Sequence, residues 1–259
     1  MKKTIALAIA ISLSLGVSLL AQEKKNYPKP GQMTHDMTEF WEPQPPVVDA
    51  GKQNGSAPSD AIVLFDGKDL SAWTASDGSE PKWKVKGGEV TVVKKNAGDI
   101  RTKDVFGSCQ LHLEWSTPKN ITGSDQARGN SGVYLQGMYE IQILDCFQNE
   151  TYANGMVGSV YKQSAPLVNP MRAPGEWNTY DIIYTAPVFK EDGTYLYEPR
   201  VTVLMNGILI QNNTAIHGTT EYIGLPRVVK HGDGPIILQM HGDPSEPISF
   251  RNIWIRDLR

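Results

Sequence analysis

Two short segments alternate polar and apolar side chains and carry groups that can move protons. In YEIQILD, Glu140 and Gln142 alternate with two isoleucines. In PIILQMHG, Gln239 and His241 share one face, because successive side chains of a strand point to opposite sides. Carboxyl and imidazole groups are common catalytic acids and bases, and amides hydrogen-bond to hydroxyl groups. The spacing therefore predicts a polar face that binds a hydroxylated ligand and transfers protons.

A third segment repeats this alternation. In QLHLEW, His112 and Glu114 lie opposite two leucines and a tryptophan. One interpretation is that such faces simply meet water, as is usual for antiparallel sheets. A solvated face is commonly rich in Lys, Thr and Ser, whereas these segments carry Glu, Gln and His. We therefore expect the three strands to contribute to one concave ligand-binding face.

The elements that must position these side chains are strands. WKVKGGEVTVV (83–93) and VTVLMNGILIQ (201–211) predict two hairpins, and the second has Asn206 and Gly207 at its turn. This pair accepts the positive φ angles of a type I′ turn. Short strand-like runs continue to the C-terminus, and no helical period extends over three turns. Many strands without crossover helices predict an all-β sandwich or jelly roll.

The chain divides into three predicted segments. Residues 1–21 join a basic start to a short apolar run, which is typical of an export signal rather than a membrane span. We therefore expect an exported, soluble protein of the periplasm or cell exterior. Residues 22–60 are rich in proline and predict an extended arm. Residues 61–259 form the predicted jelly-roll domain.

Composition excludes several classes of protein. The net charge of −3, without a run of Lys and Arg, argues against nucleic-acid binding. The motifs GxxxxGK, GxGxxG, HExxH and GxSxG are absent, so nucleotide and serine-hydrolase chemistry lack their usual support. Cys109 and Cys146 are the only cysteines, too few for a disulfide framework or a cysteine-rich zinc site. They either pair in an oxidising compartment or remain separate buried thiols.

An ordered set of segments over residues 61–259 resembles the bacterial 3-keto-disaccharide hydrolase domain, whose members are described as 3-keto-glucoside 1,2-lyases and 3-keto-2-hydroxyglucal hydratases. The segments are FDGKDLSAW (65–73), NSGVYLQ (130–136), YEIQILD (139–145), GSVY (158–161), PGEWNTY (174–180), NGILI (206–210), LQMHG (238–242) and FRNIWIRDL (250–258). The resemblance implies a concanavalin A-like jelly roll of two antiparallel sheets. It also implies a glycoside or oligosaccharide substrate and a partner sugar 3-oxidoreductase that supplies the ketone.

Chemistry of this kind needs a base for the C2 proton, an electrophile at the C3 oxygen and an acid for the leaving group. His241 is the first candidate for the base, or for a ligand to a divalent metal that polarises the ketone, and Glu140 is the second candidate for either role. Tyr161 could supply a proton or a stacking edge. Arg251 could steady the enolate, although a charge-paired structural role is equally expected for it.

The remaining predicted site residues would contact the sugar. Gln142 and Gln239 would orient its hydroxyl groups. The others are His112, Glu114 and Asp145 on or beside the polar strands and Asn130 in the NSGVYLQ segment. No cofactor other than the possible divalent metal is expected.

Two alternatives remain open. Glucanases of the concanavalin A-like class carry two carboxylates on one strand, and a bulge could return Asp145 to the face of Glu140. The pair would then act as nucleophile and acid/base about 5–5.5 Å apart. The second alternative is a lectin-like module that binds sugar without chemistry, because a jelly roll alone does not imply catalysis.

Overall fold

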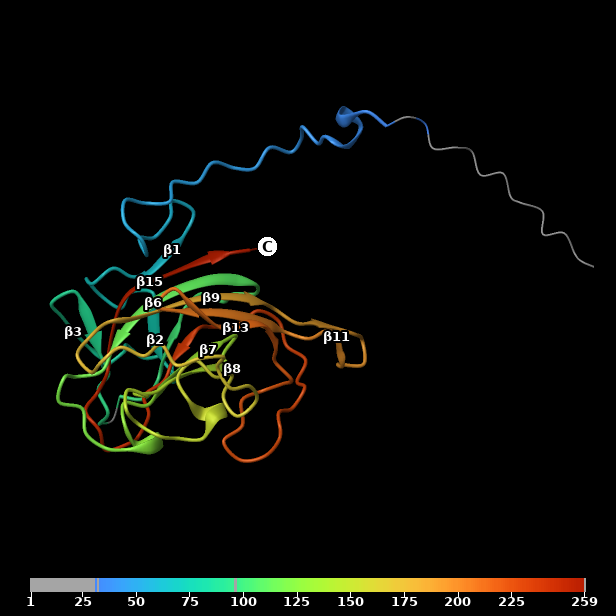
Figure 1. Ribbon diagram of the computed structural model, residues 1–259. Coiled ribbons are helices and arrows are strands. Elements are labelled where there is room, and N and C mark those ends of the chain that lie inside the picture. Colours follow the sequence, from blue (N-terminus) through green and yellow to red (C-terminus); the bar gives the residue numbers. More distant parts are fainter. Residues whose placement is uncertain (1–30, 32, 96, 259) are drawn as a thin grey trace, which may run out of the picture. The chain divides into compact units, whose positions relative to one another are not determined.

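The computed structural model describes residues 31, 33–95 and 97–258 (Figure 1). The predicted export signal at 1–21 lies outside these residues and stays a prediction. The chain forms two compact units, Met1–Pro46 and Val47–Arg259. The described part of the first unit contains one turn of 3-10 helix, η1 (His35–Thr38), followed by exposed Phe40 and Trp41. Within the described residues, no helix has both the length and the apolar character needed to cross a membrane.

The second unit is built from two antiparallel sheets. The larger sheet has the order β13-β12-β9-β6-β15-β4-β3, and β1 also pairs with β15. Its strands are β1 (Ile62–Phe65), β3 (Lys84–Lys86), β4 (Glu89–Thr91), β6 (Cys109–Ser116), β9 (Asn178–Thr185), β12 (Arg200–Met205), β13 (Ile208–Ala215) and β15 (Ser249–Asp257). The smaller sheet has the order β2-β5-β14-β7-β8. Its strands are β2 (Trp73–Ala75), β5 (Ile100–Thr102), β7 (Ser131–Leu135), β8 (Tyr139–Ile143) and β14 (Ile237–Leu238).

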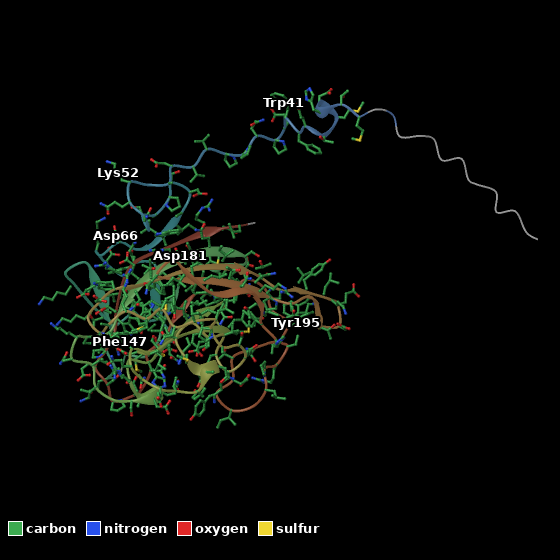
Figure 2. The ribbon with its side chains drawn as sticks, in the orientation of Figure 1. Trp41, Lys52, Asp66, Phe147, Asp181 and Tyr195 are labelled. Carbon is green, nitrogen blue, oxygen red and sulfur yellow. The ribbon has the colours of Figure 1, made fainter. Side chains whose placement is uncertain are left out.

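Three short elements complete the described part of this unit. A two-stranded ribbon, β10 (Val188–Phe189) with β11 (Tyr195–Tyr197), projects from the sandwich, and Tyr195 marks it in Figure 2. Two single 3-10 turns, η2 (Asp125–Ala127) and η3 (Ala153–Gly155), lie in the loops around β7 and β8. The observed architecture, a sandwich of two antiparallel sheets, confirms the predicted all-β jelly-roll fold.

Alternation along the strands explains why the sheets pack together. In β6, Leu111, Leu113 and Trp115 are fully buried, and in β8, Ile141 and Ile143 are fully buried. These side chains belong to one apolar core that is filled from both sheets. Removal of this apolar surface from water stabilises the sandwich.

Both predicted hairpins are present. β3 pairs with β4 and β12 pairs with β13. Asn206 and Gly207 have φ angles of 54° and 77°, which are the left-handed values that the predicted tight turn requires.

The two cysteines do not pair. Cys109 lies in β6 and Cys146 follows β8, and both are free and buried. Burial raises the pKa of Cys109 to about 12 and that of Cys146 to about 11. Of the two alternatives, a disulfide or two separate buried thiols, the structure therefore contains the second.

Candidate functional site

A cavity of about 1080 Å³ opens over the outer face of the smaller sheet. Its floor comes from β7, β8 and the segment that continues β14. Loops near η2 and η3 and the loop before β14 form its walls. The side chains that line it include Gln126, Asn130, Tyr134, Glu140, Gln142, Tyr152, Tyr161, Lys162, Thr220, Tyr222, Gln239, His241 and Asp243.

Strand register brings four of the predicted residues together. In the β7–β8 pair, Tyr134 lies opposite Glu140 and Gly132 lies opposite Gln142. The backbone N–H of Gln239 donates to the carbonyl of Gly132 at 3.0 Å, which extends the β14–β7 pairing by one residue. Period-two alternation then places Gln239 and His241 on the same face as Glu140 and Gln142.

Glu140 is a buried carboxyl group in the cavity floor, with only 3 % of its surface exposed. Burial raises its pKa to about 8, a hydrogen bond with Tyr134 opposes this shift, and the nearby charge of Asp99 adds to it. The absence of a side chain at Gly132 makes room for the carboxyl group, since a Cβ there would lie 2.2 Å from Glu140 Oε1. At neutral pH this group is therefore mostly protonated and can act as an acid.

His241 lies at the other side of the floor and is held by Asp243. Its Nδ1 is 3.1 Å from Asp243 Oδ2 and 3.2 Å from the Asp243 backbone nitrogen. The imidazole is 38 % exposed, whereas the Asp243 carboxylate is 1 % exposed. Nδ1 either donates to the Asp243 carboxylate or accepts from the Asp243 backbone N–H, according to the tautomer. In the tautomer with the proton on Nδ1, Nε2 is free to accept a proton from a ligand.

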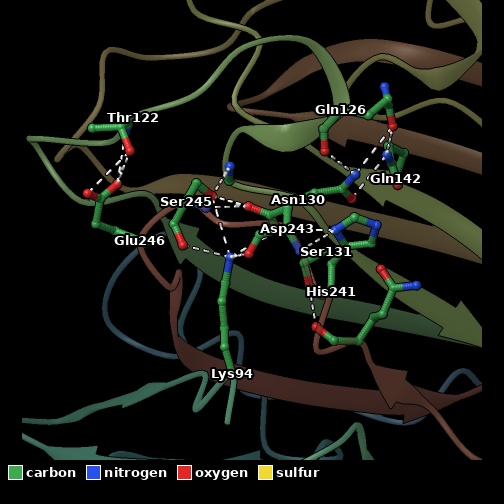
Figure 3. A network of polar contacts seen from close by, with 12 residues as sticks. Lys94, Thr122, Gln126, Asn130, Ser131, Gln142, His241, Asp243, Ser245 and Glu246 are labelled. Carbon is green, nitrogen blue, oxygen red and sulfur yellow. Dashed lines mark hydrogen bonds and ion pairs between the residues drawn. The ribbon is translucent and has the colours of Figure 1, made fainter.

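A partly buried lysine fixes the segment that carries this pair (Figure 3). Lys94 Nζ lies 2.9 Å from Asp243 Oδ2 and donates to the carbonyls of Asp243 (3.0 Å) and Ser245 (2.8 Å). The Ser245 hydroxyl donates to the Asp243 carboxylate and accepts from the Gly129 backbone at 2.8 Å. Burial alone would raise the pKa of Asp243, but hydrogen bonds from His241, Ser245 and Lys94 outweigh it and lower the pKa to about 2.

Amide groups line the floor beside Glu140. The Gln142 amide nitrogen lies 3.1 Å from Gln126 Oε1 and 3.3 Å from Asn130 Oδ1. If the amide is turned over, the nitrogen lies 3.2 Å from Glu140 Oε1 instead. The Gln239 amide donates to the Tyr134 hydroxyl at 3.2 Å, and its Oε1 is buried without a protein partner. Such amides are suited to binding sugar hydroxyl groups.

Tyr161 also lines the cavity, and its hydroxyl lies 2.8 Å from that of Tyr152. The structure thus brings together Tyr161, Asn130 and the four residues of the sheet. It adds residues that the sequence patterns did not indicate: Lys94, Asp243, Tyr134, Tyr152, Lys162, Thr220 and Tyr222. Only Asp243 had a local signal, because it follows His241 by two residues in a turn-like HGDPS segment.

The expectation that the strand carrying His112 and Glu114 joins this face is wrong. That strand is β6, which belongs to the larger sheet, between β9 and β15. His112 is buried there with Nδ1 2.7 Å from Asp181, and Glu114 pairs with Arg251 at 2.6 Å. Alternation shows which side chains share a face of one strand, but it does not show which sheet the strand joins.

Arg251 also lies on the larger sheet, in the charge-paired arrangement that the sequence offered as the alternative to a catalytic role. Besides its ion pair with Glu114, its guanidinium lies 4.0 Å from the ring centroid of Trp177. These contacts are on the larger sheet, and Arg251 is not among the residues that line the cavity.

Asp145 also lies away from the cavity. It is fully buried, accepts from Thr117 Oγ1 at 2.8 Å and from the Phe147 backbone at 3.1 Å, and lies 3.5 Å from Arg128 Nε. β8 ends at Ile143, and no bulge returns Asp145 to the face of Glu140. The two-carboxylate arrangement thus lacks its second carboxylate.

The donor set does not fit a metal site. Over residues 31, 33–95 and 97–258, no three His, Cys, Asp or Glu side chains come together in a way that could hold a metal ion. His241 and Glu140 do not form such a group with the other carboxylates that line the cavity, Asp125 and Asp243. Their predicted metal-binding role stays a prediction, and the chemistry below uses protein groups alone.

Comparisons with known proteins identify relatives of this chain. A crystal structure of a candidate glycosyl hydrolase from Parabacteroides distasonis ATCC 8503 is 64 % identical, with a TM-score of 0.85 over 87 % of this chain and 97 % of that one. A second candidate glycosyl hydrolase from the same organism is 23 % identical, with a TM-score of 0.54 over 76 % of this chain and 99 % of that one, and shares the fold. No functionally curated protein is significantly similar in sequence. Residues 60–256 match the model of the 3-keto-alpha-glucoside-1,2-lyase-like domain, and the chain therefore belongs to this family.

Proposed function

We propose that the protein is a glycoside-acting enzyme that cleaves 3-keto-glycosides by elimination, and that hydration of the product makes the net reaction a hydrolysis. The observation that carries this proposal is the pairing, in one cavity, of an imidazole held by a buried carboxylate with a carboxyl group whose pKa is raised by burial. The family match and the descriptions of the two Parabacteroides proteins support a glycoside substrate.

The proton next to a ketone is acidic, so a ketone at C3 makes the C2 proton removable. In the proposed reaction His241 Nε2 takes this proton, and the electron pair of the C2–H bond forms an enolate. Protonated Glu140 donates a hydrogen bond to the developing C3 oxyanion, which lies in a site largely shielded from water. Gln142 and Gln239 hold the neighbouring hydroxyl groups.

Collapse of the enolate breaks the C1–O bond and forms the C1–C2 double bond. The departing oxygen receives a proton, either from the imidazolium of His241 or through the Tyr161 hydroxyl, and leaves as an alcohol. Addition of water across the C1–C2 bond then gives free 3-ketoglucose. This order of reaction steps requires an earlier oxidation of the sugar at C3, which we assign to a separate sugar oxidoreductase. The products distinguish the two steps. Elimination alone releases the sugar with a C1–C2 double bond, and elimination followed by hydration releases 3-ketoglucose.

Incubation of the protein in D2O with a glucoside and with its 3-keto derivative, with and without chelator, tests this proposal. We expect cleavage of the keto sugar alone, with deuterium at C2 of recovered substrate, in both conditions. His241→Ala should lower C2 exchange by about 10²-fold or more, as is typical for loss of a general base. His217→Ala is a matched control, because that imidazole is 65 % exposed and does not line the cavity.

Four results would contradict the proposal or one of its parts. Cleavage of the unoxidised glucoside would favour an ordinary glycoside hydrolase. Binding of either sugar without turnover would favour the lectin-like alternative. Undiminished exchange in His241→Ala would remove His241 from the mechanism, and loss of activity in chelator would show that a metal takes part.

A further inference from the structure

The cavity extends across the strands beyond the proposed reaction centre. His241 follows β14, Tyr134 lies in β7 and Glu140 lies in β8, in the sheet order β14-β7-β8. The edge of β8 is then covered by two further segments: Tyr161 N–H donates to the Glu140 carbonyl at 3.1 Å, and Glu140 N–H donates to Thr220 Oγ1 at 2.9 Å. Neighbouring strands lie about 4.8 Å apart, so these segments begin roughly 14 Å from the His241 side.

This length exceeds what one reacting sugar ring needs. The volume of about 1080 Å³ lies just above the range for sites that hold drug-sized ligands, about 300–1,000 Å³. A ring that contacts both His241 and Glu140 covers the floor from β14 to β8. The space beyond β8 remains for a second part of the substrate.

Three tyrosines from two separate loops line that space, and we call Tyr152, Tyr161 and Tyr222 the tyrosine rim. The hydroxyls of Tyr152 and Tyr161 are 2.8 Å apart, and their rings are inclined at 60°. Tyr152 is 38 % exposed and Tyr222 is 74 % exposed. Exposed aromatic rings with polar tips offer flat apolar surface together with hydrogen-bonding groups.

Lys162 joins the two loops at the rim. Its ammonium group lies 4.5 Å from the ring centroid of Tyr222, 5.5 Å from that of Tyr161 and 5.9 Å from that of Tyr152. It also donates to the Tyr222 carbonyl at 2.5 Å. The backbone of Lys162 has a φ of 58°, a left-handed value that is uncommon for a residue with a side chain and is often found at functional sites.

We infer that the tyrosine rim and Lys162 form a binding subsite for the leaving group, and that it takes a ring with a flat apolar face, from either a sugar or an aromatic aglycone. The inference rests on the proposed function, because it assumes that the departing group at C1 points across β8. The ring would stack on Tyr222 and Tyr152, and its hydroxyl groups would accept from Lys162 or pair with the tyrosine hydroxyls.

Three 3-keto-glucosides that differ only in the leaving group test this inference: methyl, phenyl and glucosyl. We expect Tyr222→Ala to lower the ratio of kcat/KM for the phenyl over the methyl substrate, and for the glucosyl over the methyl substrate, by roughly three- to tenfold, the usual effect of one lost stacking contact. Lys162→Met should lower the glucosyl ratio more than the phenyl ratio, because it removes a hydrogen-bond donor. Tyr197→Ala is the matched control, since Tyr197 is 67 % exposed on β11 and outside the cavity.

The outcomes separate the inference from the proposed function. If the wild-type protein cleaves all three substrates and both ratios stay unchanged in both variants, the inference is wrong and the elimination chemistry stands. If the wild-type protein cleaves none of them, the proposed function fails and the inference fails with it. A lowered phenyl ratio alone assigns the subsite to aromatic aglycones, and a lowered glucosyl ratio alone assigns it to sugars. Circular dichroism checks that each variant is folded. Tyr222→Ala should fold normally, because the Tyr222 side chain is exposed and its loss removes little packing.

Discussion

Glu140 combines a functional position with a cost to stability. Its carboxyl group is buried beside Tyr134, with room provided by Gly132, and its pKa is about 8 in the folded chain. In the unfolded chain a glutamate has its ordinary pKa of 4.5. Between these two values the folded state keeps a proton that the unfolded state releases. The contribution of this group to stability is therefore full below pH 4.5 and is lost as the pH rises through about 8.

Glu140→Gln should remove this pH dependence, because an amide carries no proton to lose. We expect the melting temperature of the variant, compared with that of the wild type, to rise from pH 5 to about pH 8 and to level off above it. The slope for one such group is about 1.4 kcal/mol per pH unit. Glu80→Gln, which changes an exposed carboxylate, is the control. If the melting temperatures of the wild type and of Glu140→Gln changed with pH in the same way, Glu140 would not be buried as a neutral acid.

At the scale of elements, the turn after β14 depends on a distant side chain. Lys94, which follows β4, donates to three oxygens of Asp243 and Ser245 and thereby holds the imidazole of His241 over the floor. The Asp243 carboxylate is 1 % exposed, so loss of the ammonium group would leave a buried charge with fewer partners.

Lys94→Met should therefore act on both folding and turnover. We expect the free energy of unfolding to fall by roughly 2–4 kcal/mol and kcat to fall more than KM changes, because Lys94 positions His241 without touching the sugar. Denaturant titration and steady-state kinetics with a 3-keto-glucoside measure the two effects. Lys95→Met, at the exposed neighbouring position, should change neither. Equal losses in the two variants would refute the positioning role.

The strands and their faces could be predicted because alternation is a local property. It identified Glu140, Gln142, Gln239 and His241, which the structure places in one cavity. The partner of a strand is not local: β6 pairs with β9 and β15, which follow it by some 70 and 140 residues, so the sheet that receives His112 could not be read from β6 itself. Lys94, Tyr152 and Tyr222 were missed for the same reason, since loops from distant parts of the chain bring them to the site.

At the scale of the whole molecule, the second unit begins before the family match. The match starts at residue 60, whereas the compact unit starts at Val47. Gly55 closes over the outer face of the larger sheet, where its carbonyl accepts from Asn252 Nδ2 at 2.8 Å and from Trp254 Nε1 at 2.9 Å. Beneath it lies His112. Burial alone would lower the pKa of His112, but hydrogen bonds with Asp181 and Glu114 raise it to about 9.

Two truncations should distinguish these boundaries. Removal of residues 1–46 should leave the melting temperature within about 2 °C of that of the full-length protein. Removal of residues 1–60 should lower it by roughly 4 °C or more. The Trp254 indole and the Asn252 amide would lose the Gly55 carbonyl as acceptor, and the buried His112 ring would meet water. Differential scanning calorimetry at pH 7 measures both. Identical melting temperatures for the two truncated proteins would show that the segment around Gly55 adds no stability.

The free thiols of Cys109 and Cys146 give the protein an internal reporter of unfolding. One thiol lies in the larger sheet and the other directly follows the last strand of the smaller sheet. Both are buried, and their raised pKa values keep the reactive thiolate scarce. An alkylating reagent therefore reaches each sulfur only when the layer around it opens. The rates at which the two positions are modified report the opening of each layer separately, without an engineered label.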